Sequence, residues 1–562
     1  MAGIAQPSAT AFQPSPCCPR LRTISGESKP VSTSAAAEPQ SASAAGPGRW
    51  RRAASPFAVA LLVLAASFAN FLNYHSYPMV RLEVLLVLAG LAVAAALFGL
   101  LHAGASQFGR ALLDGLLAFI AVNLNSDSVI AAGFAASIFA FARLARDISL
   151  HAILAIVSGV VLFSSLTGLS ERRAPIATVK QPVPPASQPK AILHIILDEH
   201  GGTGGAQDAG FRKELTDFYA TRGFRLFDRA YSRHFHTVNA IPDLLNFGHP
   251  GESRNVQESL DIGRTAYLSG LQQQGYRLNI YQSDFADFCR YSRYASCTSY
   301  WSPSMAFLSG EPMPPGGKAR LLAFKFAALS SLALTAANGI DRVTHLPWTR
   351  PLGLPVIAPK ERAASSSLGG LAILDRMASD LRSAQPGEAY FAHVLAPHFP
   401  YVAAGDCHIL PPVRWQYRRS ASPVAAREAA YRQQVACVMR KLDRVIAAFE
   451  SSPAGRNGVI IIHGDHGSRI TKLDPIDADA GKLSPADLMA GYSTLFAVRA
   501  PGVPPGVEAR PYATPDILKQ MMASGFASVD DIRPGDGQVH LDGPNWTVGK
   551  PISIAKAWPA AN

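Results

Sequence analysis

Aspartate and histidine side chains stand at the ends of three apolar segments of this 562-residue chain. The run Val459 to Ile462 is typical of a buried parallel strand, and it leads into a Gly-Asp-His-Gly turn. Ligands bind beyond the carboxyl ends of parallel strands, so we expect side chains at these ends to gather. Carboxylate and imidazole ligands together favour Zn²⁺ or Mn²⁺ over Ca²⁺. The candidate ligands and catalytic residues at these ends are Asp198, Glu199, His393, His398, Asp465 and His466.

Thr237 is the candidate nucleophile. It follows a strand pattern that ends at Tyr231, and it precedes a helical pattern in which Pro242 is expected in the first turn. The N–H groups and the dipole of a helix N-terminus favour anions, and a bound metal lowers the pKa of a hydroxyl group. Thr237 is alternatively a simple helix cap. The metal-type ligands elsewhere in the chain favour a nucleophile that also binds the metal.

These motifs resemble the alkaline phosphatase/sulfatase superfamily, and more closely its membrane-anchored envelope branch of phosphoethanolamine transferases and lipoteichoic acid synthases. Thr237 and Pro242 have the spacing of the nucleophilic threonine and the following proline in the phosphoethanolamine transferases. Asp465 and His466 match the Asp-His-Gly metal ligands of the family. The resemblance covers the apolar segments near the N-terminus and residues 191–523.

The resemblance also assigns roles to the remaining candidates. His393 and His398 match a His-x4-His pair near the substrate phosphate, and Asp198 or Glu199 matches the acidic ligand after the first strand. The chain departs from the family in two ways. It has no Cys/Ser-x-Pro-x-Arg motif, which disfavours the hydrolysis of sulfate esters. Cysteines flank the threonine motif in the phosphoethanolamine transferases, but Arg233 and Asp243 stand there in this chain.

The resemblance implies an α/β fold, an alkaline-phosphatase-like mixed sheet sandwiched by helices, after a five-helix transmembrane region. It implies a metal-dependent transferase, with Zn²⁺ as the first candidate and Mn²⁺ as the second. The enzyme would move a phospholipid head group, such as phosphoethanolamine or phosphoglycerol, through phospho-threonine to lipopolysaccharide or another envelope glycan. The alternatives are a sulfatase-like hydrolase, either a phosphodiesterase or a sulfuric ester hydrolase, and a non-catalytic relative that binds lipid.

Composition and charge favour a membrane protein that carries a large extramembrane domain. Apolar residues make up 48% of the chain and charged residues 16%. The net charge is +12, the arginines are scattered along the chain, and the sequence has no nucleic-acid-binding motif. A basic surface that faces anionic lipid is the better explanation of this charge. The five apolar segments that we expect to span the membrane are Phe57 to Leu72, Leu82 to Leu101, Ala111 to Val122, Val129 to Leu144 and Leu150 to Leu169.

Arginines near these segments predict the orientation in the membrane. They precede the first segment and follow the second and the fourth, which places the N-terminus in the cytoplasm. Five crossings then place the following domain in the periplasm, at the outer face of a bacterial inner membrane. Asp114, in the third segment, is expected at the membrane interface near Arg110.

The chain divides into five regions by composition. We expect a disordered cytoplasmic tail over 1–55, the transmembrane region over 56–169 and a proline-rich linker over 170–190. Alternating strand and helix patterns predict a catalytic domain over 191–530, and 531–562 is expected to be a C-terminal tail. Residues 309–365 interrupt the pattern. Their apolar stretch, Leu321 to Ala337, is either an inserted core helix or an amphipathic lid on the membrane.

Four cysteines fall in the domain that we expect to be exported. An even number in an oxidising compartment predicts disulfides. Sequence proximity favours Cys289 with Cys297, which leaves Cys407 with Cys437.

Overall fold

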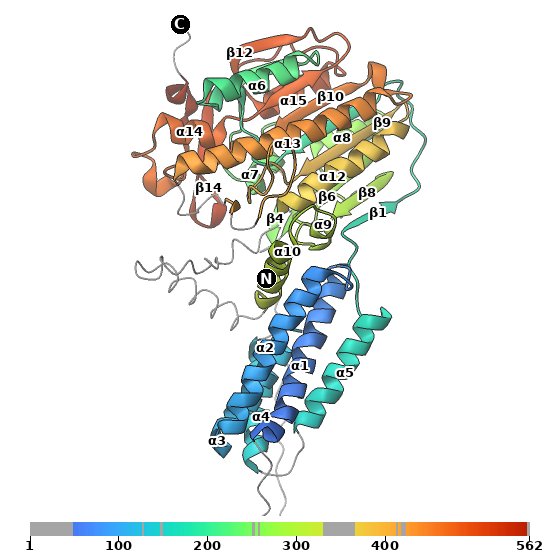
Figure 1. Cartoon of the computed structure of the whole chain (residues 1–562). Coiled ribbons are helices and arrows are strands. Elements are labelled where there is room, and N and C mark those ends of the chain that lie inside the picture. The colour runs from blue at the N-terminus through green and yellow to red at the C-terminus, as the bar shows by residue number, and fades with distance from the viewer. Residues whose placement is uncertain are drawn as a thin grey trace, which may run out of the picture. The chain divides into compact units, whose positions relative to one another are not determined.

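The computed structural model describes residues 49–125, 129–145, 150–249, 253–256, 259–329, 366–411, 414–416 and 423–558 (Figure 1). The expected N-terminal tail lies outside the described residues up to residue 48. The part of the expected insertion after residue 329 also lies outside them until residue 366.

The apolar segments near the N-terminus form helices, and α1 packs against α2 and α5 while α3 packs against α4. Within the described residues, only two stretches are long and apolar enough to cross a membrane, Ala53–Tyr74 of α1 and Leu82–Gly104 of α2. The sequence predicts five membrane-spanning helices, and this number is wrong, because the described residues contain two candidates. The other helices have 17 or 18 residues, at the lower limit of about 17 that a spanning helix needs. The bounds are α1 (Arg49–Tyr74), α2 (Leu82–Gly104), α3 (Gln107–Asn123), α4 (Val129–Ala145) and α5 (Leu150–Thr167).

A mixed sheet of nine strands forms the centre of the following domain, which confirms the predicted α/β class. Strands β8, β6, β9, β2 and β10 are parallel neighbours, β11 runs antiparallel to β10 and β3, and β1 is an antiparallel edge strand. In spatial order the strands are β1 (Ile176–Lys180), β8 (Ser296–Tyr300), β6 (Arg277–Ser283), β9 (Glu388–Val394), β2 (Ile192–Leu197), β10 (Val459–Gly464), β11 (Phe496–Arg499), β3 (Arg225–Tyr231) and β12 (Gly506–Ala513).

Helices cover both faces of this sheet, and successive residues of the central strand β2 enter different cores. Leu193 and Ile195 pack in the core on the side of α12 (Ser366–Asp380) and α13 (Val424–Glu450). Ile192 and Ile196 pack in the core on the side of α7, α8 and α15. Each buried Leu or Ile contributes roughly 1.5–3 kcal/mol, and a one-residue slip would move every side chain of the strand to the other face. The two cores therefore lock the register of β2 and of the residues that follow it.

Several elements differ from the sequence-based expectations. Strand β5 precedes α8, and α8 starts after Thr265, whose hydroxyl accepts a hydrogen bond from the Leu268 N–H group (3.2 Å). Strand β1 lies in the expected linker, and a hairpin lies in the expected C-terminal tail. The remaining elements are α6 (Ala209–Ala220), α7 (Thr237–Leu245), β4 (Ser253–Val256), β5 (Ser259–Ile262), α8 (Ala266–Gln273), β7 (Ala286–Asp287), α9 (Ala306–Ser309), α14 (Pro485–Tyr492), α15 (Thr514–Ala523), β13 (Gln538–Asp542) and β14 (Val548–Ser553).

Helix α10 (Pro315–Ala327) carries the described part of the apolar stretch that begins at Leu321. It packs against α2, and Phe326 contacts the rings of Phe68 and Phe71 in α1 at centroid distances of 5.2 and 5.8 Å. This part of the stretch is thus a helix in contact with α1 and α2.

Two disulfides are present, Cys289–Cys297 and Cys407–Cys437, as the sequence predicts. The first disulfide joins Cys289 to Cys297 of β8. The second joins Cys407, in the loop after β9, to Cys437 of α13. Their sequence separations are 8 and 30 residues.

The two disulfides should contribute unequally to stability. A cross-link that closes a longer loop removes more entropy from the unfolded chain. Replacement of Cys407 and Cys437 by Ala should lower the free energy of unfolding by about 3.5 kcal/mol, and the same change at Cys289 and Cys297 by about 2.5 kcal/mol. Urea unfolding of the two detergent-solubilised double variants measures the difference. A larger loss from the Cys289–Cys297 pair would contradict the loop-length argument.

Candidate active site

The carboxyl ends of three parallel strands bring the first candidate ligands together. In the sheet, Leu197 at the end of β2 lies opposite Val394 of β9 and Gly464 of β10. Asp198 directly follows the last residue of β2, and Asp465 directly follows the last residue of β10. His393 is the penultimate residue of β9. One ligand atom from each of the three lies within 4.8 Å of the others, and all three residues are buried. The parallel register therefore produces the cluster that the sequence predicts.

Glycines shape the turn after β10. A Cβ atom at Gly464 would overlap the carbonyl oxygen of His200, and one at Gly467 would overlap the carbonyl oxygen of Ala490. Only residues without a Cβ atom allow this close approach of the backbone. The turn therefore requires Gly on both sides of Asp465-His466.

Thr237 and His466 complete the cluster from the other side. The Thr237 Oγ1 atom lies 3.1 Å from His466 Nε2. The same nitrogen lies 3.7 Å from Asp198 Oδ1 and 3.2 Å from Asp465 Oδ2. Thr237 is the first residue of α7, so its hydroxyl lies at the N-terminus of the helix. Pro242 lies in the second turn of α7, not in the first turn where the sequence placed it, because the helix already begins at Thr237.

The residues of this cluster fit a divalent cation. Among the described residues, no hydrogen-bond partner reaches Asp198 Oδ1, Asp465 Oδ2 or either ring nitrogen of His393, although all are buried. Burial and the nearby carboxylates of Asp465 and Glu199 raise the pKa of Asp198 well above its usual range. Buried acceptors without partners are costly, and a cation would satisfy the two carboxylate oxygens and the unprotonated nitrogen of His393. Desolvation lowers the pKa of His393 and of His466 to about 4, so both imidazoles are neutral at pH 7, as ligation requires.

Glu199 does not face the cluster. Its Oε1 accepts from Arg469 Nε (2.7 Å) and from Arg469 Nη2, and its Oε2 accepts from the Phe399 N–H group (3.1 Å). The backbone of Glu199 has a φ of 66°, which is uncommon for a residue with a side chain. This turn directs two consecutive acidic side chains to different partners. Of the two acidic candidates, Asp198 thus lies in the cluster, and Glu199 forms a buried ion pair.

The two histidines of the His-x4-His pair also separate. His393 lies in the buried cluster, whereas His398 lies on the wall of the neighbouring cavity. His398 Nδ1 donates to the Phe399 carbonyl oxygen, so its Nε2 accepts from Arg469 Nη2 at 3.2 Å. Of the two histidines, only His398 lines the cavity.

Arg469 is the main residue that sequence reasoning missed. Its guanidinium group is buried, and it lies over the rings of Phe235 and Phe399 at 5.9 Å from each centroid. In the sequence it resembles the other scattered arginines. The available signal was its position three residues after His466.

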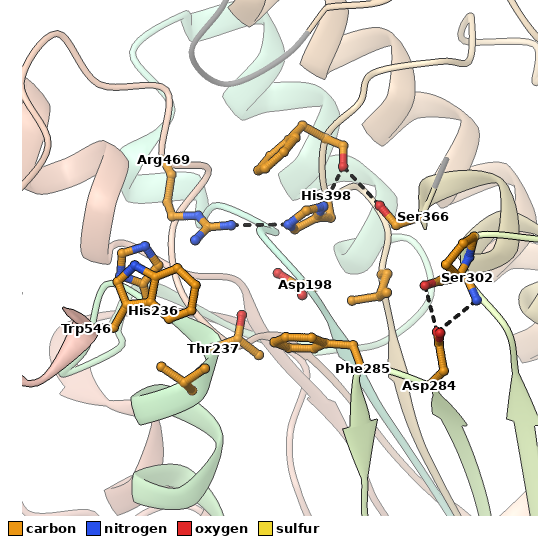
Figure 2. Close-up of a pocket in the computed structure, with 14 residues that line it drawn as sticks. Asp198, His236, Thr237, Asp284, Phe285, Ser302, Ser366, His398, Arg469 and Trp546 are labelled. Carbon is orange, nitrogen blue, oxygen red and sulfur yellow. Dashed lines mark hydrogen bonds between the residues drawn. The ribbon is translucent and has the colours of Figure 1, made fainter. Parts of the chain in front are cut away.

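A cavity of about 580 Å³ opens beside the cluster (Figure 2). Figure 2 shows Asp198, Thr237, His398 and Arg469 around it. The cavity therefore joins an ionisable cluster, a hydroxyl at a helix N-terminus and a cationic side chain to apolar walls. Its other lining residues are His236, Val238, Asp284, Phe285, Ser302, Pro303, Ser366, Leu395, Phe399 and Trp546.

A chain of hydrogen bonds lies beneath the cluster within the sheet. His463 Nδ1 pairs with the Gly464 carbonyl oxygen (2.8 Å), so it carries the proton and its Nε2 is an acceptor. His194 Nε2 must then donate to His463 Nε2 (2.7 Å), and His194 Nδ1 accepts from the Tyr267 hydroxyl (2.8 Å). Desolvation lowers the pKa of His463 to about 4, so this neutral arrangement persists at pH 7. It holds the carbonyl group next to Asp465 in place.

Comparison with known proteins gives matches among solved structures. No protein-family model and no curated protein matches the chain. The zinc complex of the C-terminal periplasmic domain of EcEptC from Escherichia coli matches with a TM-score of 0.38 and 10% identity, over 66% of this chain and 97% of that chain. A protein of the alkaline phosphatase superfamily from Vibrio parahaemolyticus matches with a TM-score of 0.34 and 12% identity, over 64% and 74%. A putative sulfatase from Bacteroides thetaiotaomicron matches with a TM-score of 0.35 and 14% identity, over 62% and 73%.

One of these matched structures is described as a member of the alkaline phosphatase superfamily, which the motifs of this chain resemble.

Separate substitution of Asp198 and of Glu199 by the corresponding amide should show which of the two carboxylates binds zinc. Asp198→Asn removes a charge from the cluster and should weaken zinc binding by more than about a hundredfold. Glu199→Gln is the matched control, because it removes a charge one residue away that is paired with Arg469. It should change zinc affinity by less than about tenfold. Competition with a zinc-binding dye measures both affinities. A greater loss with Glu199→Gln would show that the ligands are assigned wrongly.

Proposed function

We propose that the chain is a metal-dependent phosphoryl transferase of the alkaline phosphatase/sulfatase superfamily, with Thr237 as its nucleophile. The observation that carries this proposal is the position of the Thr237 hydroxyl. It lies at a helix N-terminus, 3.1 Å from His466 of the buried cluster, and it lines the cavity. A hydroxyl between cation ligands and an open cavity suits attack on a bound phosphate ester.

Zn²⁺ is the proposed metal, with Mn²⁺ as the second candidate. Asp198, Asp465, His466 and Thr237 would hold it, with His393 as a further donor from the floor of the site. Imidazole and carboxylate donors together suit these metals. When bound, the metal would supply positive charge that lowers the pKa of the hydroxyl group and offsets the charge of the phosphoryl oxygens.

The residues of the chain then have distinct tasks. Thr237 Oγ1 loses its proton and forms a bond to phosphorus, while the bond from phosphorus to the diacylglycerol oxygen breaks and that oxygen takes up a proton, so diacylglycerol leaves as an alcohol. Arg469 and the N–H groups at the start of α7 hold the phosphoryl oxygens, since both are donors to anions. The buried Glu199 carboxylate and His398 fix the direction of the guanidinium group. A hydroxyl of the acceptor attacks phosphorus in the second step and releases Thr237.

The proposed donor is a phospholipid head group such as phosphoethanolamine or phosphoglycerol. The proposed acceptor is lipopolysaccharide or another envelope glycan. Helices α1 and α2 support a donor that lies in a membrane, because each contains a stretch long and apolar enough to span one. The two disulfides support an oxidising location, which we propose is the periplasmic side of a bacterial inner membrane.

Removal of the Thr237 hydroxyl tests the proposed chemistry. Thr237→Ala should reduce the release of diacylglycerol from phosphatidylethanolamine or phosphatidylglycerol vesicles by more than about a thousandfold, because no other group replaces the nucleophile. Thr237→Ser is the matched control and should keep measurable turnover. Mass spectrometry of the intact wild-type protein after exposure to donor should show a head-group adduct that Thr237→Ala lacks.

The acceptor separates a transferase from a hydrolase. A transferase should release diacylglycerol faster when lipopolysaccharide is added, and the head group should appear on the glycan. Equal release without acceptor, with a free head group as the product, would identify a hydrolase. Turnover by Thr237→Ala near the wild-type rate would disprove the covalent mechanism.

A further inference from the structure

Three polar side chains meet inside the helical region, away from the cavity beside Thr237. His102 lies in the last turn of α2, Asp114 lies within α3, and His151 is the second residue of α5. His102 and Asp114 are buried, and the side chain of His151 is 17% exposed. The sequence predicts an Asp114 at the membrane interface near Arg110, which stays a prediction, and the structure buries its side chain between the two histidines. Ionisable groups among apolar helices are costly, so their close grouping requires a physical reason.

The three side chains converge on one point. The Nε2 atoms of His102 and His151 both lie 3.1 Å from the same oxygen, Asp114 Oδ1. The ligand atoms of all three residues lie within 4.8 Å of one another. The two imidazole rings are tilted by 54° with centroids 5.5 Å apart, so each points toward the carboxylate from its own direction.

This spacing suits coordination of a metal. Ligand atoms around a tetrahedral zinc ion, with bonds of about 2.0–2.1 Å, lie about 3.3 Å apart. Each imidazole nitrogen forms a hydrogen bond of 3.1 Å with the carboxylate oxygen, and this separation is also close to the spacing of zinc ligands. Two imidazole nitrogens and one carboxylate oxygen also form a known zinc ligand set that leaves a further position open. Ca²⁺ and Mg²⁺ prefer oxygen ligands, so imidazole disfavours them.

The backbone holds the ligands in place before any ion binds. A Cβ atom at Gly99, one turn before His102, would lie 2.9 Å from the Ala53 carbonyl oxygen of α1. A Cβ atom at Gly115, next to Asp114, would lie 2.8 Å from the Ala136 carbonyl oxygen of α4. Close approach of small residues rigidifies helix pairs. The Arg110 Nε group also donates to the His102 carbonyl oxygen (3.2 Å), which joins the end of α2 to α3.

We propose that His102, Asp114 and His151 form a second metal site, selective for Zn²⁺ or a similar first-row divalent ion, that links α2, α3 and α5. The site does not depend on the proposed transferase activity, because it shares no residue with the cluster around Thr237. His151 has the most exposed side chain of the three proposed ligands. The site stabilises the helical region by joining three helices that are separate in the sequence.

Zinc content of the full-length protein in detergent tests the proposal. The Asp465→Asn variant removes a ligand of the other cluster, so zinc that remains reports on the helical region. After zinc loading and passage over a chelating resin, Asp465→Asn should retain about one zinc ion per chain. The double variant Asp465→Asn/Asp114→Asn should lose it. His151→Ala in place of Asp114→Asn should have the same effect, and it changes a less buried side chain.

A matched control removes a buried polar group of α5 that lies outside the cluster. Ser165→Ala deletes a hydroxyl group that donates to the Val161 carbonyl oxygen of its own helix, and it should leave the zinc content unchanged. Cobalt loading of Asp465→Asn should give the visible absorption of a tetrahedral site, and Asp114→Asn should abolish it. A zinc-free Asp465→Asn protein would overturn the proposal. Equal zinc content with and without Asp114→Asn would also overturn it and would identify a hydrogen-bonded cluster without metal.

Discussion

Two buried carboxylates, Asp198 and Asp465, share one small volume at the ends of β2 and β10, and the surrounding site depends on how their charge is balanced. Like charges repel strongly where water is excluded, and each buried acceptor without a partner adds a further cost. The parallel register of β2 with β9 and β10 imposes this proximity, because it aligns the last residues of all three strands. The hydrophobic cores on both faces of the sheet stabilise that register. The proposed cation between the carboxylates would resolve the conflict, and the neutral imidazoles of His393 and His466 would be its further ligands.

Arg469 balances a third acid in the same space. It binds Glu199 and so removes that carboxylate from competition for the cation, while its remaining donors lie at the cavity. The pair is buried, so its strength comes from several hydrogen bonds in a region without water. One ion pair therefore serves both the metal cluster and the cavity wall. In the proposed mechanism, it separates the carboxylate that would hold the cation from the guanidinium group that would hold the phosphoryl oxygens.

The turn between α1 and α2 contacts the segment that forms part of the cavity wall. His75, between α1 and α2, stacks on Trp301 with ring centroids 4.5 Å apart. It also accepts a hydrogen bond from the Met305 N–H group (3.3 Å), and its carbonyl oxygen accepts from the Ser304 hydroxyl (3.2 Å). The segment from Trp301 to Met305 includes Ser302 and Pro303 of the cavity wall. A lipid head group in the cavity would thus lie near the segment that contacts these helices.

The local pattern of apolar and polar residues predicted the α/β class, the central strands and the kinds of side chain at the site. Continuous apolar runs marked β2, β9 and β10, because a strand buried on both faces needs no polar residues. The residues at the ends of those runs then had to lie at one edge of the sheet, and the structure brings Asp198, His393 and Asp465 together there. The strand β1 and the hairpin of β13 and β14 escaped detection. Edge strands and short hairpins bury few side chains and leave a weak pattern.

Only the tertiary structure decided how neighbouring candidates divide their roles. Asp198 and Glu199 are adjacent and chemically alike, and the left-handed backbone at Glu199 directs them to different partners. That conformation is stable because Arg469, distant in the sequence, satisfies the diverted carboxylate. The meeting of His102, Asp114 and His151 depends in the same way on helix packing that no local pattern encodes. The sequence by itself determined which groups can bind a metal or attack phosphorus. Long-range packing determined which of them meet, because side-chain direction follows from backbone turns and strand register set by contacts across the whole fold.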